Sequence, residues 1–361
     1  MRDVIVIGGG PAGLAAAAAV AARGLDALVL ERRALPVDKA CGEGLLPGGV
    51  RALEALGAAR HLDPDGWSPL RSIRWVQEDG SSAEARLPAP GGMGIRRLAL
   101  SRALAARARE AGAEVREEAP VVSHRRDADG TTVVLASGEE IRARLLVAAD
   151  GLASAVRERE GLSRTTRSPR RFGLRRHFAL APWTDAVEVH FSRGVEAYVT
   201  PVGPRRVGLA FLFEEGAAPD FESLLARFPA LAARLDGAPF DSALAGAGPL
   251  GRDASTRILD RLLLAGDAGG YVDAITGEGV SLALEEALLL GSLLPEALPR
   301  GATRAALLPW ERAVRARHRR HAAVTRLVLS MARRPLLRRT AVAWLGRAPR
   351  LFDALVAGAV G

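Results

Sequence analysis

A glycine-rich turn near the start of the chain constrains the fold more than any other feature of the sequence. Residues 8–13 are Gly-Gly-Gly-Pro-Ala-Gly, which fits the pattern G-x-G-x-x-G. The turn follows an apolar run, Asp3–Ile7, and precedes an alanine-rich segment, Leu14–Arg23, that is typical of a helix. A strand, such a turn and a helix in this order predict a dinucleotide-binding βαβ unit, in which the helix N-terminus faces a pyrophosphate.

Five residues of this turn have predicted roles in binding the dinucleotide. Gly8 allows the tight turn, Gly10 lets the backbone approach the pyrophosphate, and Gly13 lets the helix pack closely on the strand. Pro11 and Ala12 complete the turn, and we expect both to lie against the cofactor. The alternative is a glycine turn without a ligand, but an acidic residue stands where a dinucleotide-binding unit needs one.

That acidic residue is Glu31, which follows the second predicted strand, Asp26–Leu30. It comes about 20 residues after the turn, where a carboxylate accepts a hydrogen bond from the ribose of the nucleotide. Arg32 and Arg33 come directly after it, and an arginine at this place can bind a 2′-phosphate. This motif alone therefore leaves NADP open as an alternative nucleotide.

A second motif lies far along the chain, where an apolar strand, Ile258–Ala265, runs into Gly266 and Asp267. Two further glycines, Gly277 and Gly279, precede a long predicted helix. This segment resembles the Gly-Asp motif of the superfamily that contains the flavoprotein hydroxylases and the geranylgeranyl reductases. The resemblance implies that the dinucleotide is FAD.

The same resemblance implies a set of contacts with the flavin half of FAD. Asp267, preceded by Gly266, would hold the ribitol chain, and the backbone around Gly277, Gly279 and Val280 would face the pyrimidine ring. A helix N-terminus at this place puts a positive dipole end where a reduced flavin carries negative charge. The alternative is an aspartate that only caps the helix, which leaves the two later glycines unexplained.

A third motif consists of Asp150 and Gly151, followed by Ser154 and Arg157. It resembles the Asp-Gly motif D-G-x-x-S-x-x-R of the same superfamily, which implies that Asp150 lies near FAD. The alternative is a helix capped by Asp150, with Ser154 and Arg157 on its surface. The three motifs occur in the superfamily's order over roughly residues 1–300, so together they carry the resemblance further than any one of them does.

The single lysine and the single cysteine of the chain, Lys39 and Cys41, stand together in the segment 38–44, Asp-Lys-Ala-Cys-Gly-Glu-Gly. This segment resembles the Lys-x-Cys-Gly segment that geranylgeranyl reductase-like proteins place beside the flavin. The resemblance implies that Cys41 and Gly42 contact the flavin, that Lys39 and Cys41 are candidate catalytic residues, and that Arg102 contacts FAD. The alternative is a solvated loop lysine and a small buried thiol.

The resemblance also implies an α/β fold like that of para-hydroxybenzoate hydroxylase, with a discontinuous, Rossmann-like FAD-binding domain. Apolar and polar residues alternate between residues 171 and 214, which predicts an inserted substrate domain built on an antiparallel β-sheet. A basic helical region is expected to follow. The predicted segments are 1–69, 95–165 and 256–300 for the FAD-binding domain, 70–94 and 166–255 for the substrate domain, and 301–361 for the C-terminal region.

Positive charge is concentrated in this C-terminal region. Residues 301–361 contain 13 arginines, with Glu311 and Asp353 as the only acidic residues. Predicted helices at 302–330 and 336–346 combine these arginines with leucine, valine and tryptophan. Such helices either lie on an anionic membrane surface or cover the substrate pocket and expose an arginine face. Nucleic-acid binding is disfavoured, because a basic patch is its only support.

Other features of the sequence limit the kinds of site and location. One cysteine cannot form an internal disulfide, and no cluster of histidines and carboxylates has metal-ligand spacing, so we expect no metal site. The N-terminus does not resemble a signal peptide, and no run reaches the roughly 20 apolar residues of a membrane span. We therefore expect a cytoplasmic protein, with peripheral membrane contact through the basic C-terminal helices as an option.

The leading functional hypothesis from the sequence is an FAD-dependent, NAD(P)H-dependent monooxygenase that hydroxylates a hydrophobic substrate, such as a phenolic lipid or a polyketide. The Asp-Gly and Gly-Asp motifs support it, and the lack of a second G-x-G-x-x-G implies that NAD(P)H binds only transiently. Gly270 and Ala274 stand where many hydroxylases have histidine and proline. Two alternatives are therefore kept: a geranylgeranyl reductase-like enzyme that saturates isoprenoid double bonds, and a non-catalytic flavin-binding redox sensor.

Overall fold

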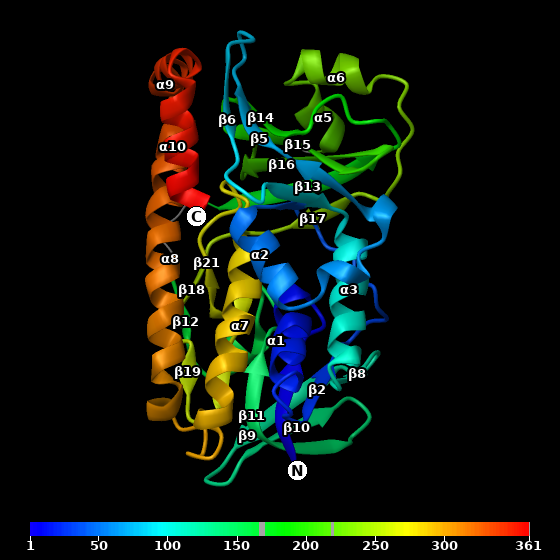
Figure 1. The fold of residues 1–361 in the computed structure, drawn as a ribbon, viewed down its shortest axis with the longest axis vertical. Helices are drawn as coiled ribbons and strands as arrows, with labels where there is room; N and C mark the ends of the chain where they lie inside the picture. The colour runs from blue at the N-terminus through cyan, green and yellow to red at the C-terminus, as the bar shows by residue number, and fades with distance from the viewer. Residues whose placement is uncertain (166–169, 218–219, 361) are drawn as a thin grey trace.

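The computed structural model of the chain describes residues 1–165, 170–217 and 220–360. Two large β-sheets follow one another along the longest axis of the molecule, and helices flank both of them (Figure 1). The central strands of the first sheet are parallel, whereas the second sheet is mainly antiparallel. This arrangement confirms the predicted α/β fold, with a Rossmann-like half, an antiparallel half and C-terminal helices.

The first sheet has eight strands and builds the Rossmann-like half. Its main path follows the order β19 (Ile258–Leu259), β20 (Leu262–Leu264), β11 (Glu140–Ala148), β1 (Arg2–Ile7), β2 (Ala27–Leu30) and β8 (Glu114–Arg116). Off this path, β10 (Thr131–Leu135) pairs with β11 and with β9 (Val121–Arg126). Because β1 is covered on both faces, Val4–Ile7 form a continuous apolar run, as a buried parallel strand requires.

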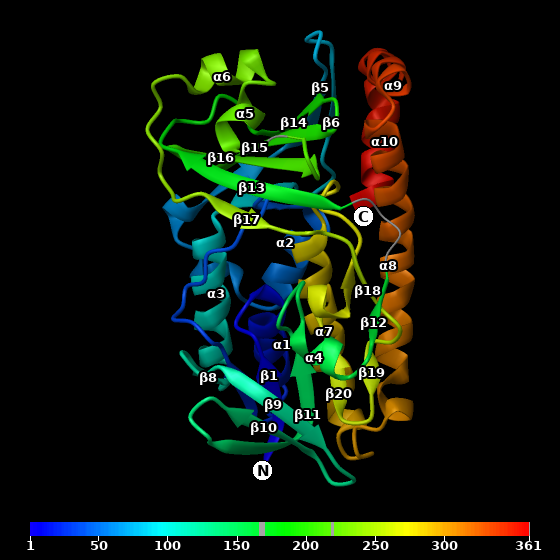
Figure 2. The same cartoon turned by 180° about the vertical axis from the view of Figure 1, so that it is seen from behind.

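Both faces of the first sheet are covered. One face packs against α1 (Pro11–Ala21), α3 (Arg97–Glu110) and α7 (Gly279–Ala297), as Figure 1 shows. The other face packs against the β9–β10 hairpin and α4 (Ala155–Arg159), which are seen from behind in Figure 2. The carboxyl ends of β1, β2, β11 and β20 therefore open toward the second sheet.

Helix α1 packs unusually closely on its neighbours because most of its residues are alanine. It begins at Pro11, three residues earlier than Leu14, because proline at the first helical position has a fixed φ and no N–H that needs a partner. A Cβ on Gly291 of α7 would lie 2.6 Å from the carbonyl oxygen of Ala19, so glycine is needed where the two helices touch.

The second sheet has seven strands. They follow the order β17 (Ala245–Ala247), β13 (Arg171–Phe178), β16 (Arg206–Glu214), β15 (Val195–Gly203), β14 (Ala186–Ser192), β5 (Ser72–Val76) and β6 (Ser82–Arg86). Two short helices that the sequence did not predict, α5 (Phe221–Leu225) and α6 (Pro229–Leu235), cover one face. Ala197 and Val199 of β15 point toward them, whereas Tyr198 and Thr200 point toward the first sheet.

Smaller elements connect the two halves. One three-stranded sheet contains β3 (Gly44–Leu45), β7 (Gly92–Ile95) and β4 (Trp67–Leu70), and another contains β12 (Ser163–Arg164), β18 (Arg252–Ala254) and β21 (Gly270–Tyr271). The other helical segments before the C-terminal region are α2 (Pro47–Ala55) and the single turns η1 (Ala59–His61), η2 (Pro64–Gly66) and η3 (Gly266–Gly269). Residue 166, the predicted start of the second substrate-domain segment, lies outside the described residues.

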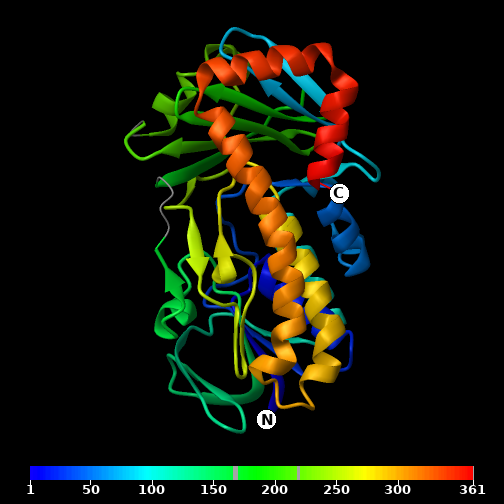
Figure 3. The ribbon, with the colours of Figure 1, turned by 90° about the vertical axis from the view of Figure 1, so that its left-hand side faces the viewer.

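Three helices build the C-terminal region, from residue 304 onward, and residue 361 lies outside the described part. They are α8 (Arg304–Ala332), α9 (Pro335–Arg347) and α10 (Pro349–Val360), which run along one side of both sheets (Figure 3). Pro335 and Pro349 begin α9 and α10, as expected for a residue that interrupts one helix and suits the start of the next. None of the helices in the described ranges is both long and apolar enough to span a bilayer.

Candidate active site

A cavity of about 890 Å³ lies between the carboxyl ends of the first sheet and the inner face of the second. Its walls come from the loops after β1, β2, β11 and β20 and from the strands β5, β14, β15 and β16. In open α/β sheets, ligands bind at the carboxyl ends of the strands. The cavity is therefore the expected place for a dinucleotide, and it continues into space between the two sheets.

Most residues that the sequence singled out line this cavity. They are Gly8, Gly10, Pro11, Ala12, Glu31, Arg32, Arg33, Lys39, Cys41, Gly42, Asp150, Gly266, Asp267, Gly277, Gly279 and Val280. Gly13 lies beneath the turn, where a Cβ would be 1.9 Å from the carbonyl oxygen of Gly8, as its predicted packing role requires. Arg102 does not line the cavity, because it is exposed on the far side of α3; Arg97 of the same helix lines it instead.

The first glycine turn has the geometry of a cradle for a diphosphate. Gly8 has a φ of +108°, and a Cβ there would lie 2.4 Å from the carbonyl oxygen of Ala149. A Cβ on Gly10 would meet nothing within 4 Å, so this residue faces open space at the start of α1. Glu31 is buried and accepts the N–H of Gly9 at 2.6 Å, which ties the turn to the end of β2.

The turn of the second motif is held against the first turn. A Cβ on Gly266 would lie 2.7 Å from the Cβ of Ala12, so the two turns touch through glycine. The N–H of Gly266 donates to Glu286 at 2.8 Å, and Glu286 is buried beside Arg257 (3.3 Å) and His318 (2.5 Å). Burial would raise the pKa of Glu286, but Arg257, His318 and this N–H stabilise its charge and lower the pKa.

The third motif contributes a carboxylate with a free oxygen atom. Asp150 accepts the N–H of Val156 through Oδ2 at 3.2 Å, whereas its buried Oδ1 has no partner among the described residues. Ser154, not Asp150, caps α4 by accepting the N–H of Arg157 at 3.0 Å. Ser154 and Arg157 are both buried, so the alternative of a surface helix capped by Asp150 is wrong.

Arg157 joins the third motif to the second. Its Nη2 donates to the carbonyl oxygen of Leu152 at 2.8 Å, and its Nη1 donates to those of Ala268 at 2.9 Å and Asp267 at 3.3 Å. A single guanidinium therefore holds the two loops at a fixed separation, at the carboxyl ends of the strands of the first sheet.

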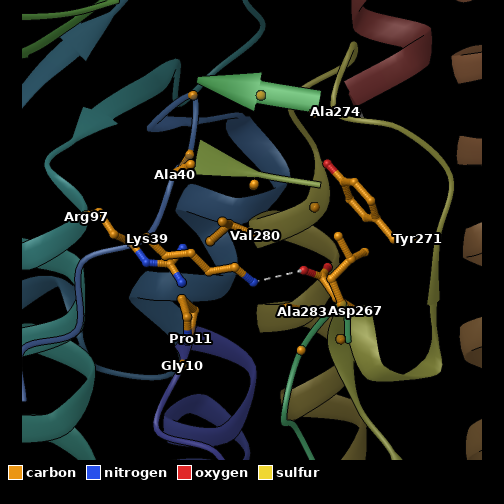
Figure 4. Close-up of a pocket in the computed structure, with 18 of the residues that line it drawn as sticks. Gly10, Pro11, Lys39, Ala40, Arg97, Asp267, Tyr271, Ala274, Val280 and Ala283 are labelled. Carbon is orange, nitrogen blue, oxygen red and sulfur yellow. Dashed lines mark ion pairs between the residues drawn. The ribbon is translucent and has the colours of Figure 1, made fainter. Parts of the chain in front are cut away.

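The Lys39–Cys41 segment crosses the cavity opposite these loops (Figure 4). The Nζ of Lys39 lies 3.9 Å from Oδ2 of Asp267, and it would lie 3.4 Å from a Cβ on Gly151. Cys41 is partly buried, and its Sγ accepts the N–H of Glu43 at 3.3 Å. Lys39 thus reaches the second and third motifs, and all three segments face the same space.

A buried charge network holds this segment in place, and no sequence pattern predicts it. Glu43 is the centre of the network and has a backbone φ of +59°. Its Oε1 accepts the N–H of Arg97 at 2.7 Å and lies 3.2 Å from Nη1 of Arg96. Its Oε2 lies 2.5 Å from Nε2 of His177. Burial would raise the pKa of Glu43, but His177, Arg175 and Arg96 stabilise its charge and lower the pKa. Glu43 is therefore an anion held inside the protein.

His177 is neutral in this network, and its proton lies on Nε2. Burial lowers the pKa of His177 more than the Glu43 carboxylate raises it. Its Nδ1 lies 3.1 Å from Nη1 of Arg175, which can only donate, so Nδ1 is an acceptor and Nε2–H points at Glu43. Arg175 also pairs with Asp38 and donates to the carbonyl oxygen of Lys39 at 3.1 Å, which anchors the segment on β13.

The end of the cavity beneath the second sheet is apolar. Its walls include Trp75 and Phe191 from the sheet, Val328 from α8 and Val356 from α10, so the C-terminal helices cover this end. Tyr271 lines the cavity beside Asp267 and Ala274 (Figure 4). Burial raises the pKa of the Tyr271 phenol well above its usual value, so the hydroxyl stays protonated. This arrangement suits a mostly hydrocarbon ligand with few polar groups.

The residues around the polar end fit an FAD. The space in front of Gly10 admits a diphosphate at the N-terminus of α1, and the unpaired Oδ1 of Asp150 is a free acceptor for a ligand donor. Glu31 would hold the ribose, Asp267 the ribitol, and the α7 N-terminus at Gly279 would face the flavin ring. When bound, FAD supplies the redox chemistry, while these residues bind and orient it.

Comparison with known proteins agrees with this fit. A family model described as an FAD binding domain matches residues 1–207. Digeranylgeranylglycerophospholipid reductase 1 of Methanothermobacter thermautotrophicus is 30% identical over 324 residues, which are 83% of this chain and 78% of that protein. The menaquinone reductase of Mycobacterium tuberculosis is 30% identical over 322 residues, 81% of this chain and 76% of that protein.

A solved structure shares the fold over almost the whole chain. A flavoprotein/dehydrogenase from Cytophaga hutchinsonii superposes with a TM-score of 0.85 at 21% identity, and the match covers 99% of this chain and 92% of that one. The matches to FAD-dependent enzymes overturn the alternative of a non-catalytic sensor. The chain is an FAD-dependent oxidoreductase, and it belongs to the flavoprotein superfamily of the aromatic hydroxylases and the geranylgeranyl reductases.

Proposed function

We propose that this protein uses FAD to saturate carbon–carbon double bonds of an isoprenoid lipid. The observation that carries the proposal is the composition of the cavity, in which a polar end that fits FAD continues into an apolar end walled by Trp75, Phe191, Val328 and Val356. A long hydrocarbon chain loses contact with water in such a space. The relatives named as reductases of a geranylgeranyl lipid and of menaquinone support the same substrate class.

Saturation of a double bond adds a hydride equivalent and a proton, so the cavity must also offer a proton donor. Two weak acids line it without donating a hydrogen bond to any described residue: the phenol of Tyr271 and the thiol of Cys41. The phenol of Tyr198 also lines it, but it donates to the carbonyl oxygen of Ile275 at 2.8 Å. Tyr271 stays protonated because burial raises its pKa. Arg175 is buried and holds the 38–44 segment through the carbonyl oxygen of Lys39, and the ammonium of Lys39 is directed at Asp267. We assign proton delivery to Tyr271 or Cys41 and the placement of the segment to Arg175.

Hydroxylation of a phenolic lipid or a polyketide, the leading hypothesis from the sequence, is the second candidate function. Its support is the pair of Asp-Gly and Gly-Asp loops that Arg157 joins, because the motifs on these loops resemble those of the superfamily that contains the hydroxylases. Such a reaction needs little acid–base catalysis by the protein, because the cofactor and oxygen supply the oxidation chemistry. In either case we propose NAD(P)H, bound transiently, as the electron donor.

Product mass distinguishes the two candidates. Purified protein with FAD is supplied with NADH, NADPH or dithionite and with long-chain phenols, menaquinones and geranylgeranyl lipids, in air and without oxygen. The reductase predicts products heavier by pairs of hydrogens that form without oxygen. A product heavier by one oxygen, formed only in air, would establish the hydroxylase instead.

The proton donor is tested with two conservative variants. Tyr271→Phe and Cys41→Ser keep the shape of the cavity. Whichever of the two substitutions removes the proton donor should lower the rate of reduction by about 100-fold, within the usual range for general acid catalysis. The FAD absorbance of both variants should match that of the parent protein. If both keep full activity, neither side chain delivers the proton.

A further inference from the structure

The outer surface of the three C-terminal helices carries large apolar side chains that no other part of the described chain covers. Leu336 is 81% exposed, Leu327 is 71% exposed and Trp344 is 56% exposed. Figure 3 looks onto the side of the molecule that these helices form. We call this surface the α8–α10 face; its exposed apolar residues are Leu327, Leu336, Leu337, Trp344, Leu351 and Leu355.

These residues form stripes along their helices rather than isolated exposed positions. Leu337 and Trp344 of α9 are seven residues apart, which is two helical turns, and Leu351 and Leu355 of α10 are one turn apart. The opposite sides of α9 and α10 already bury Val342 and Phe352 against β6 and its neighbours, so the core does not need the exposed stripes. Grouped exposed apolar side chains on a folded protein indicate an apolar partner.

The charge of the α8–α10 face identifies the kind of partner. Arg326, Arg334, Arg347 and Arg350 are exposed and have no carboxylate partner among the described residues. The one acidic residue of α9 and α10, Asp353, instead faces β6, where it accepts the N–H of Arg86 at 2.7 Å. Exposed leucine and tryptophan beside unpaired arginines match the interface of an anionic lipid bilayer, in which apolar groups insert and arginines pair with phosphate headgroups.

The α8–α10 face and the apolar end of the cavity share two helices. Val328 of α8 and Val356 of α10 line the cavity, whereas the residues directly before them, Leu327 and Leu355, are exposed. The same two helices therefore present apolar side chains inward to the cavity and outward to solvent.

We propose that the α8–α10 face docks on an anionic membrane, so that the cavity receives its lipid substrate from the adjacent leaflet. Binding to the membrane is inferred from the exposed side chains and the charge of this surface. Entry of the lipid substrate from the membrane also depends on the function proposed above. The docking part can be tested without substrate, and the loading part is tested separately.

Docking is measured by co-sedimentation with vesicles of phosphatidylcholine alone and of equal parts phosphatidylcholine and phosphatidylglycerol. The FAD-loaded protein should bind the anionic vesicles at least about tenfold more tightly than the neutral ones, and high salt should weaken the binding. The variant Leu336→Glu/Leu337→Glu/Trp344→Glu should lose about tenfold or more of this affinity. Leu244→Glu is the matched control, because Leu244 is an exposed leucine outside the α8–α10 face.

Three outcomes would overturn docking on a membrane. One is equal binding of the triple variant and the parent protein, with normal FAD content and melting temperature in both. Another is binding that does not distinguish anionic from neutral vesicles. The third is a dimer, detected by sedimentation velocity, that the triple variant converts to a monomer, because the face would then be an interface between two copies of the chain.

Substrate loading is separated from the chemistry by the form in which the lipid is offered. The triple variant should process a detergent-dispersed isoprenoid lipid as fast as the parent protein, and the same lipid in anionic vesicles about tenfold more slowly. Equal loss of activity in both forms would overturn the loading role. Failure of the parent protein to reduce the lipid in detergent would count against the proposed function and leave the vesicle-binding result to decide the docking surface.

Discussion

The guanidinium of Arg157 donates a hydrogen bond to the carbonyl oxygen of Ala268 at 2.9 Å, across 111 positions of the chain. Because Arg157 also binds Leu152, this contact sets the distance between the loop after β11 and the loop after β20. Asp150 and Asp267, which we assign to FAD, lie on these two loops. The position of both carboxylates therefore depends on an arginine behind them.

Replacing this arginine should weaken FAD binding without unfolding the protein. Arg157→Lys keeps the charge but cannot make the forked contacts with both loops, and the loss of such buried bonds costs about 1–3 kcal/mol. The dissociation constant of FAD, measured by titration of the apoprotein, should rise about tenfold or more. Arg164→Lys, at an exposed arginine on β12, is the control, and an equal effect of both variants would contradict the role of Arg157.

Two glycines of the first turn should respond differently to alanine. In Gly13→Ala the new Cβ would lie 1.9 Å from the backbone of Gly8, so the turn must shift and the apoprotein should lose about 1–3 kcal/mol of stability. In Gly10→Ala the new Cβ meets only open space, so the apoprotein should melt normally while FAD affinity falls. Thermal melts and FAD titrations check both, and a destabilised Gly10→Ala apoprotein would show that Gly10 does not face an open ligand site.

The sequence was sufficient to predict the Rossmann-like half and most of the cavity's polar end, because each element there has a local signal. The turn at residues 8–13 follows an apolar strand, and Asp150 and Asp267 each follow another, so the parallel sheet alone brings them to one edge. The resemblance predicts that Arg102 contacts FAD, but the phase of α3 turns Arg102 to solvent and brings Arg97 to the cavity instead.

The buried network could not be predicted, because its members are brought together by pairing between distant segments. Glu43 lies in an irregular segment and His177 on a strand of the second sheet, and nothing local to either residue indicates that they meet. Tyr271 is not predictable for the same reason: it enters the site through the short strand β21, which pairs with β18. Periodicity predicts which face of an element is buried, but not what that face meets.

The Glu43 network should stabilise the folded protein. Glu43→Gln removes a buried charge and leaves Arg96 and Arg175 without their full counter-charge, which should cost about 3 kcal/mol of unfolding free energy. Denaturant unfolding of the FAD-loaded and FAD-free forms measures this cost. Glu54→Gln, at an exposed glutamate on α2, should be neutral, and a neutral Glu43→Gln would contradict the network's role.

The stability of the second half should depend on pH through Glu196. Burial raises the pKa of Glu196 to about 7 from a usual value of 4.5, since Arg171 is shared with Asp273 and cannot neutralise both carboxylates. The folded state therefore holds a proton that the unfolded state releases between these values. The unfolding free energy should fall by about 3 kcal/mol as pH rises from about 4.5 to about 7, relative to Glu196→Gln. Parallel pH profiles of the two proteins would contradict this assignment.

Double-bond saturation by the FAD-loaded protein is tested most directly by a single turnover without oxygen. Protein with its FAD fully reduced by dithionite, freed of excess reductant, is mixed with a detergent-dispersed geranylgeranyl lipid, and flavin absorbance and lipid mass are followed together. A reductase should reoxidise its flavin, and each equivalent of flavin should yield one lipid heavier by two hydrogens. A flavin that stays reduced until air is admitted, with a lipid that then gains one oxygen, would contradict double-bond saturation.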